Sequence, residues 1–101
     1  MIYFVSRHAG AIEWVKNQNI HIDCFIEHLD LTNIHLTADD TVIGTLPVHI
    51  AAAVCATGAK FYFLQINASL AQRGKNLSAD DMQIMNCSLH RFFVEDLQEE
   101  L

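Results

Sequence analysis

Residues 41–66, TVIGTLPVHIAAAVCATGAKFYFLQI, contain a strand, a helix and a second strand in direct succession. Thr41 to Gly44 is a short apolar run, and Ala59 to Ile66, which contains three consecutive aromatic residues, is the strongest strand signal in the chain. Between them, Pro47 to Thr57 has a helical pattern: proline suits the first turn, three alanines follow, and Gly58 suits the position after the last turn. Such a unit predicts two parallel strands joined by a right-handed crossover.

The first forty residues repeat this order. Ile2 to Val5 predicts a buried first strand, a helical pattern begins at Ala11, and His21 to Ile26 is a second strand candidate. A polar connection from Asp30 to Asp40 follows, with a possible short turn at Leu31 to Ile34.

The C-terminal region predicts a long helix. Ser78-Ala79-Asp80-Asp81 resembles a capping box, and an apolar stripe at helical spacing follows it as core or as a dimer seam. The stripe consists of Met82, Met85, Leu89, Phe92 or Phe93, and Leu97. The whole order predicts one α/β domain over residues 1–101, with a mostly parallel sheet flanked by helices.

The composition limits the function. The net charge of −6 argues against a groove for long duplex nucleic acid, but allows a small anion held by a few cations and backbone amides. The three cysteines are scattered, which fits a reducing compartment, and we see no secretory signal and no apolar run of membrane-spanning length. We therefore expect a cytoplasmic protein.

Two loops are candidates for chemistry, because ligands of open parallel sheets bind where strands end and helices begin. Ser6-Arg7-His8-Ala9-Gly10 follows the first strand, and Gly44-Thr45-Leu46-Pro47-Val48-His49 follows the third. Arg7 offers two-pronged donors for a phosphate and His8 can move a proton. The hydroxyl of Thr45 suits either an anion or the helix cap.

Each candidate also has a purely structural interpretation. Arg7 can pair with an acidic residue, and His49 can be a half-buried polar residue of the first helical turn. Arg73-Gly74-Lys75 is the only cluster of positive charge, and is either a solvated loop or part of the same ligand-binding edge.

Several enzyme classes are excluded by missing motifs. The chain has no GxSxG, GxxxxGK[ST] or GxGxxG, which removes serine-triad hydrolases, P-loop NTPases and dinucleotide oxidoreductases. The other histidines (His21, His28, His35 and His90) lack metal-ligand spacing, so we expect no metal site and no cofactor.

Three segments together resemble a known family: Tyr3 to Trp14 (YFVSRHAGAIEW), Gly44 to Ala51 (GTLPVHIA) and Arg73 to Ser78 (RGKNLS). The chain resembles the sixteenth "Csx" family of small CRISPR-associated proteins, found beside type III CRISPR systems. This resemblance covers essentially the whole chain. It implies a Rossmann-like domain related to cyclic-oligoadenylate sensor domains. It also implies that the protein forms a homodimer and has ring nuclease activity on cyclic tetra-adenylate.

The motif positions that carry the resemblance define the expected site. Arg7 and His8 are the expected catalytic residues, and the expected ligand contacts are Ser6, Gly10, Gly44, Thr45, Pro47, His49 and Arg73. Opening such a ring needs no metal, because the ribose 2′-hydroxyl attacks its own phosphate and leaves a 2′,3′-cyclic phosphate. Positioning and charge stabilisation are then the main tasks of the protein.

Three other functions fit the same residues. The domain can sequester the cyclic nucleotide without cutting it. Arg7-His8 after the first strand also suits a histidine phosphatase, although Ala9 replaces the glycine usual after that histidine. Finally, the chain can be a structural or protein-interaction domain whose acidic surface contacts a basic partner.

Overall fold

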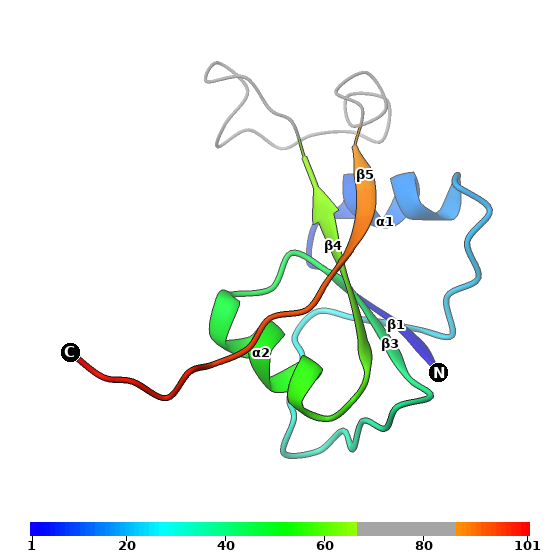
Figure 1. Ribbon diagram of the computed structural model, residues 1–101. Coiled ribbons are helices and arrows are strands. Elements are labelled where there is room, and N and C mark those ends of the chain that lie inside the picture. Colours follow the sequence, from blue (N-terminus) through cyan, green and yellow to red (C-terminus); the bar gives the residue numbers. More distant parts are fainter. Residues whose placement is uncertain (67–86) are drawn as a thin grey trace.

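The computed structural model describes residues 1–66 and 87–101. Its elements are β1 (Ile2–Val5), α1 (Ala9–Lys16), β2 (Cys24–Ile26), β3 (Thr41–Gly44), α2 (Val48–Ala56), β4 (Lys60–Gln65) and β5 (Ser88–Phe92). They form one five-stranded sheet in the order β2-β1-β3-β4-β5 (Figure 1). The first four strands are mutually parallel and β5 is antiparallel to β4. The expected α/β class with a mostly parallel sheet is confirmed.

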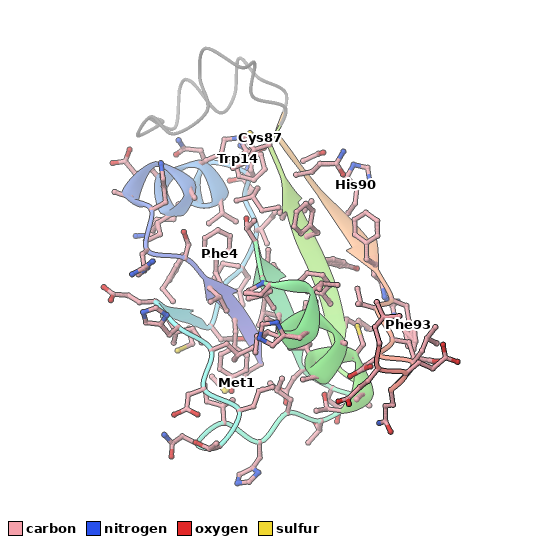
Figure 2. The ribbon with its side chains drawn as sticks, turned by 90° about the vertical axis from the view of Figure 1, so that its left-hand side faces the viewer. Met1, Phe4, Trp14, Cys87, His90 and Phe93 are labelled. Atoms are coloured by element: carbon pink, nitrogen blue, oxygen red, sulfur yellow. The ribbon has the colours of Figure 1, made fainter. Side chains whose placement is uncertain are left out.

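The two helices pack on opposite faces of the sheet. Phe4 belongs to the core cluster that contains Trp14 of α1, whereas the next residue, Val5, belongs to the cluster under α2. β3 repeats this alternation, with Ile43 on the α1 side and Val42 on the α2 side. Figure 2 shows Phe4 and Trp14 between α1 and the sheet. Because both faces are buried, the central strands are continuous apolar runs rather than alternating ones.

The central strand–helix–strand unit forms as the sequence predicts. β3 has the predicted bounds, and α2 is flanked by Pro47 as N-cap and Thr57 as C-cap. Gly58 has a φ of 89°, the left-handed conformation expected after a helix end. The predicted fourth strand is one residue shorter at each end, at Lys60–Gln65.

The N-terminal half differs at its boundaries. α1 begins at Ala9, two residues before the predicted start, because His8 caps it. β2 contains only Cys24–Ile26, since the carboxylate of Asp23 accepts a hydrogen bond of 2.8 Å from His21 and one of 2.7 Å from the amide of Ile2. The short turn after Asp30 is confirmed by bonds from the Asn33 and Ile34 amides to the Asp30 carbonyl.

The predicted long C-terminal helix is wrong where the structure describes it. Residues 88–92 form β5, which pairs Leu89 with Leu64 and Phe92 with Phe61 of β4. Residues 93–101 form an extended tail without regular structure. The proposed helix start from Ser78 to Met85 lies outside the described residues. Residues three apart lie on opposite faces of a strand, so the spacing of Leu89 and Phe92 fits a strand as well as a helix. β5 covers an edge that β4, the strongest strand, would otherwise expose.

Cys55 holds the start of this tail against α2. Its Sγ accepts a hydrogen bond from the amide of Val94 at 3.4 Å and lies 3.8 Å from the carbonyl oxygen of Phe92. The tail, residues 93–101, passes α2 and ends away from the sheet (Figure 1).

Asp40 ties β1 and β3 together at the end of the sheet where both strands begin. Its carboxylate accepts hydrogen bonds of 2.8 Å from the Met1 ammonium and from the amide of Thr37. These two donors lower the pKa of Asp40, and the carboxylate in turn raises the pKa of the Met1 ammonium. The start of β1 is thereby fixed in register with β3.

No helix in residues 1–66 or 87–101 is long and apolar enough to cross a membrane.

Candidate functional site

A pocket of about 550 Å³ lies at the carboxyl ends of the parallel strands. Three loops, which follow β1, β2 and β3, supply its polar wall, and this volume lies within the range of small-molecule sites. The polar lining residues are Ser6, Arg7, His8, Glu27, His28 and Thr45. Apolar side chains, among them Leu29, Leu46, Pro47, Ile50, Leu64 and Ile66, form the rest.

Ser6 fixes the loop after β1. Its amide donates a 2.9 Å hydrogen bond to the carbonyl of Ile26, which extends the β1–β2 pairing by one residue. Its hydroxyl accepts a 3.0 Å bond from the amide of His8. Ser6 therefore has a positioning role in holding Arg7 and His8 at the end of the strand.

His8 is the N-cap of α1. Its Nδ1 accepts a hydrogen bond of 3.2 Å from the backbone amide of Ala11. Because a backbone N–H can only donate, Nδ1 must carry the lone pair, so the proton of the neutral ring is on Nε2. This tautomer makes His8 a hydrogen-bond donor toward a ligand. It also argues against a phosphohistidine at His8, because neither nitrogen then has a free lone pair.

Arg7 is exposed on the pocket wall. Within the described ranges, no carboxylate forms an ion pair with its guanidinium. The interpretation of Arg7 as half of a structural ion pair is therefore not supported, and its donors remain able to contact an anion in the pocket.

The loop after β3 brings Thr45 and Pro47 to the same pocket. Pro47 is the N-cap of α2, and no side chain makes a capping hydrogen bond there. The interpretation of Thr45 as the helix cap is therefore wrong: Thr45 is exposed and lines the pocket. The first amides of a helix have no partner within the helix, so the start of α2 adds positive potential beside this hydroxyl.

Glu27 and His28 also line the pocket, and the sequence analysis missed them. The parallel register pairs Val5 with Ile26, so both residues follow a strand end at the same edge as Ser6. The same rule that selected the loops after β1 and β3 would have found them, had the end of the second strand been included. His28 was weighed only as a metal ligand, for which it lacks the spacing, and Glu27 was not considered.

Asp30 fixes the loop that carries these two residues. Its carboxylate accepts hydrogen bonds from the Thr32 amide at 3.0 Å, the Thr32 hydroxyl at 2.6 Å and the Asn33 side chain at 2.6 Å. These bonds lower the pKa of Asp30, so the carboxylate stays charged and stabilises the conformation of the loop.

Three of the expected ligand contacts, Gly10, Gly44 and His49, are not in the pocket lining. Gly10 is buried in the first turn of α1, and Gly44, the last residue of β3, is buried against β1, where a Cβ would lie 2.6 Å from the carbonyl oxygen of Val5. His49 lies at a separate hollow of about 360 Å³ between α2 and the tail. Arg73 lies outside the described residues. The structure thus brings together Ser6, Arg7, His8, Thr45 and Pro47.

In the part of the chain that the structure describes, no three His, Cys, Asp or Glu side chains are grouped closely enough to hold a metal ion.

These features define a small α/β protein with a ligand-sized pocket at the carboxyl ends of a mostly parallel sheet, lined by one arginine, two histidines and a threonine. The chain belongs to a family of CRISPR-associated proteins: the family model described as "Putative CRISPR-associated protein (Cas_VVA1548)" matches residues 3–95. Comparisons with curated proteins and with solved structures give no match.

Proposed function

We propose that this protein is a ring nuclease that binds a cyclic oligoadenylate, cyclic tetra-adenylate in particular, and cuts it without a metal. Its reaction would switch off type III CRISPR signalling. Membership of a CRISPR-associated family supports the setting, and the Csx resemblance of the sequence motifs supports the substrate. The Rossmann-like, sensor-domain relationship that the resemblance implies agrees with the strand order and the parallel pairing.

One observation carries the proposal. Arg7, His8 and Thr45, which come from two separate motifs of the resemblance, line one pocket beside the starts of two helices. A cationic side chain and two neutral ones that can donate hydrogen bonds thus line one small volume beside two helix starts, which suits a bound phosphodiester. The apolar wall, which includes Ile50 and Leu64, offers a surface on which an adenine can lie.

The proposed chemistry is in-line attack by the ribose 2′-hydroxyl on the adjacent phosphate. The product is a linear oligoadenylate with a 2′,3′-cyclic phosphate end. Arg7 would stabilise the negative charge on the phosphoryl oxygens, with the Nε2–H of His8 and the hydroxyl of Thr45 as further donors. The protein would hold the ribose in the attacking geometry, which converts binding energy into rate.

A homodimer is part of this proposal. A ring of four nucleotides repeats the same chemical group around its circumference, and a two-fold dimer would offer it two copies of the pocket. Val48 follows Pro47 directly and is 72% exposed, and Phe93 and Leu97 of the tail are each 71% exposed. A second copy that covers Val48 would lie beside the pocket, and one that covers the tail would bury Phe93 and Leu97.

The test is to incubate purified protein with cyclic tetra-adenylate in the presence of EDTA and to identify the products by liquid chromatography and mass spectrometry. Linear products ending in a 2′,3′-cyclic phosphate would support the proposal. An intact ring that co-elutes with the protein would instead indicate a sequestering module, and an intact ring without binding would overturn the proposal.

A further inference from the structure

The proposed reaction requires a proton acceptor. When the 2′-oxygen attacks phosphorus, its O–H bond breaks and the proton must leave. His8 is poorly suited to take it, because its Nδ1 lone pair is used by the amide of Ala11 and its Nε2 carries a proton. A second group in the pocket has to accept the proton if the protein assists this step.

We propose that His28 is this general base, an inference that rests on the proposed ring nuclease function. His28 lines the pocket together with Arg7, His8 and Thr45. It is exposed, so its ring is accessible to a ligand.

The sheet fixes His28 close to the other site residues. β2 is parallel to β1 with Val5 opposite Ile26, and the bond from the Ser6 amide to the Ile26 carbonyl continues the pairing past the end of both strands. The segments that follow β1 and β2 therefore leave the sheet side by side. The first carries Arg7 and His8, and the second carries Glu27 and His28. The hydrogen bonds of Asp30 fix the segment after β2 just beyond Glu27 and His28.

Glu27 is the competing acceptor, because it is the only other group with free lone pairs among the titratable residues of this wall, Arg7, His8, Glu27 and His28. Histidine suits the step better, since its ring takes up and releases a proton between pH 5 and 8. A carboxylate would also repel the phosphodiester that Arg7 attracts.

The step balances as follows. The 2′-O–H bond breaks and its proton passes to the unprotonated nitrogen of His28, while the 2′-oxygen forms a bond to phosphorus. The bond from phosphorus to the 5′-oxygen breaks, and the 5′-oxygen takes a proton from water. His28 then returns its proton to solvent. Arg7 and His8 act only as donors to the phosphoryl oxygens.

The experiment compares wild type with His28→Gln, Glu27→Gln and His35→Gln, with enzyme in excess over cyclic tetra-adenylate, EDTA present and pH from 5 to 8. His35 is exposed and does not line this pocket, so it is the matched control. We expect His28→Gln to lose about 10²–10⁴-fold in cleavage rate. It should still bind the ring with the affinity of wild type and should lose the rise in rate from pH 5 to 7. His35→Gln should cleave at the wild-type rate.

Each other outcome overturns a defined part of the account. If wild type leaves the ring intact, both the proposed function and the role of His28 are overturned. If wild type cuts and His28→Gln cuts equally fast with the same pH profile, only the role of His28 is overturned. Loss of the pH-dependent rise in Glu27→Gln alone would assign the base to Glu27. Loss of ring binding in His28→Gln would make His28 a binding residue.

Discussion

At the scale of single residues, His8 has a structural role as the N-cap of α1 in addition to the chemical role that we propose for it. Its Nδ1 closes the first turn of α1, and this bond places the proton of the neutral ring on Nε2. The loop therefore determines both the position of the imidazole and its tautomer.

The two roles of His8 can be separated by substitution. His8→Ala should lower the unfolding free energy by about 1 kcal/mol, because the cap is lost. His8→Asn should be as stable as wild type within ~0.5 kcal/mol, because asparagine is a good N-cap. Both variants should cut the ring more slowly than wild type. Urea denaturation measures the first effect, and equal destabilisation by both substitutions would show that the cap is not what His8 contributes.

Gly44 is required by the close approach of β1 and β3. A Cβ there would lie 2.6 Å from the carbonyl oxygen of Val5, a backbone atom that cannot rotate away. We expect Gly44→Ala to lower the unfolding free energy by about 1–3 kcal/mol, as other overpacked sites do. Thr45→Ala, at the exposed next position, should stay within ~0.5 kcal/mol of wild type. A Gly44→Ala protein as stable as wild type would mean that the two strands can separate there without cost.

Sequence reasoning found part of the site and missed part for physical reasons. Ser6, Arg7, His8 and Thr45 were predictable because strand ends of a parallel sheet meet at one edge. Gly44 was correctly placed at that edge, but the close contact that surrounds it depends on strand register, which residue type alone does not give. Glu27 and His28 carry no motif, but they follow the end of the predicted second strand, so the same rule would have found them there, and the pairing of β2 with β1 brings them to the pocket.

At the scale of elements, β5 shows where periodicity is ambiguous. Leu89 and Phe92 are three apart, which fits a helix, but in the structure they pack on opposite faces of a strand: Leu89 joins the α1-side core, and the ring of Phe92 lies 6.0 Å from that of Phe63. The sequence contains no signal for the deciding factor, which is the exposed edge of β4. By contrast, Pro47 and Gly58 are strong local signals, and α2 formed between them.

The tail is the element that we expect to hold two copies together. Phe93→Ser and Leu97→Ser should each leave the unfolding free energy within ~0.5 kcal/mol, because both side chains are largely exposed in one copy. The doubly substituted protein should sediment as a monomer at concentrations where wild type is a dimer. Figure 2 shows Phe93 on the outer side of the molecule, away from the core. A variant that remains as dimeric as wild type would exclude this face as the interface.

At the scale of the whole molecule, stability should depend on pH through the pair of Asp40 and the Met1 ammonium. The pKa of Asp40 is lowered in the folded protein, so its contribution is present above the unfolded value of ~4 and is lost as the pH falls through the folded pKa. The pKa of the Met1 ammonium is raised, so its contribution is complete below ~8 and is lost as the pH rises through the folded pKa.

Asp40→Asn tests this dependence. The difference in unfolding free energy between wild type and the variant should be largest from about pH 5 to 7 and should shrink on both sides. Using the difference removes the contributions of Asp23 and Asp30, whose pKa values are also lowered by hydrogen bonds. A difference that stays constant from pH 3 to 10 would contradict the ion pair.

The balance of charge also belongs to this scale. The chain carries a net charge of −6, which opposes the approach of a polyanionic ring. The pocket offsets this repulsion locally with the guanidinium of Arg7 and the starts of two helices. Loss of Arg7 should therefore weaken binding and cleavage of the ring far more than loss of a cation elsewhere.

The most direct test of the central claim is the rate of cyclic tetra-adenylate cleavage, with EDTA present and enzyme in excess, for wild type, Arg7→Ala and Lys60→Ala. Lys60 is an exposed cation at the start of β4, at the opposite end of the sheet from the pocket. The account predicts that wild type and Lys60→Ala open the ring at the same rate, and that Arg7→Ala is about 10²–10³-fold slower. Equal rates for all three proteins, or no cleavage by wild type, would contradict it.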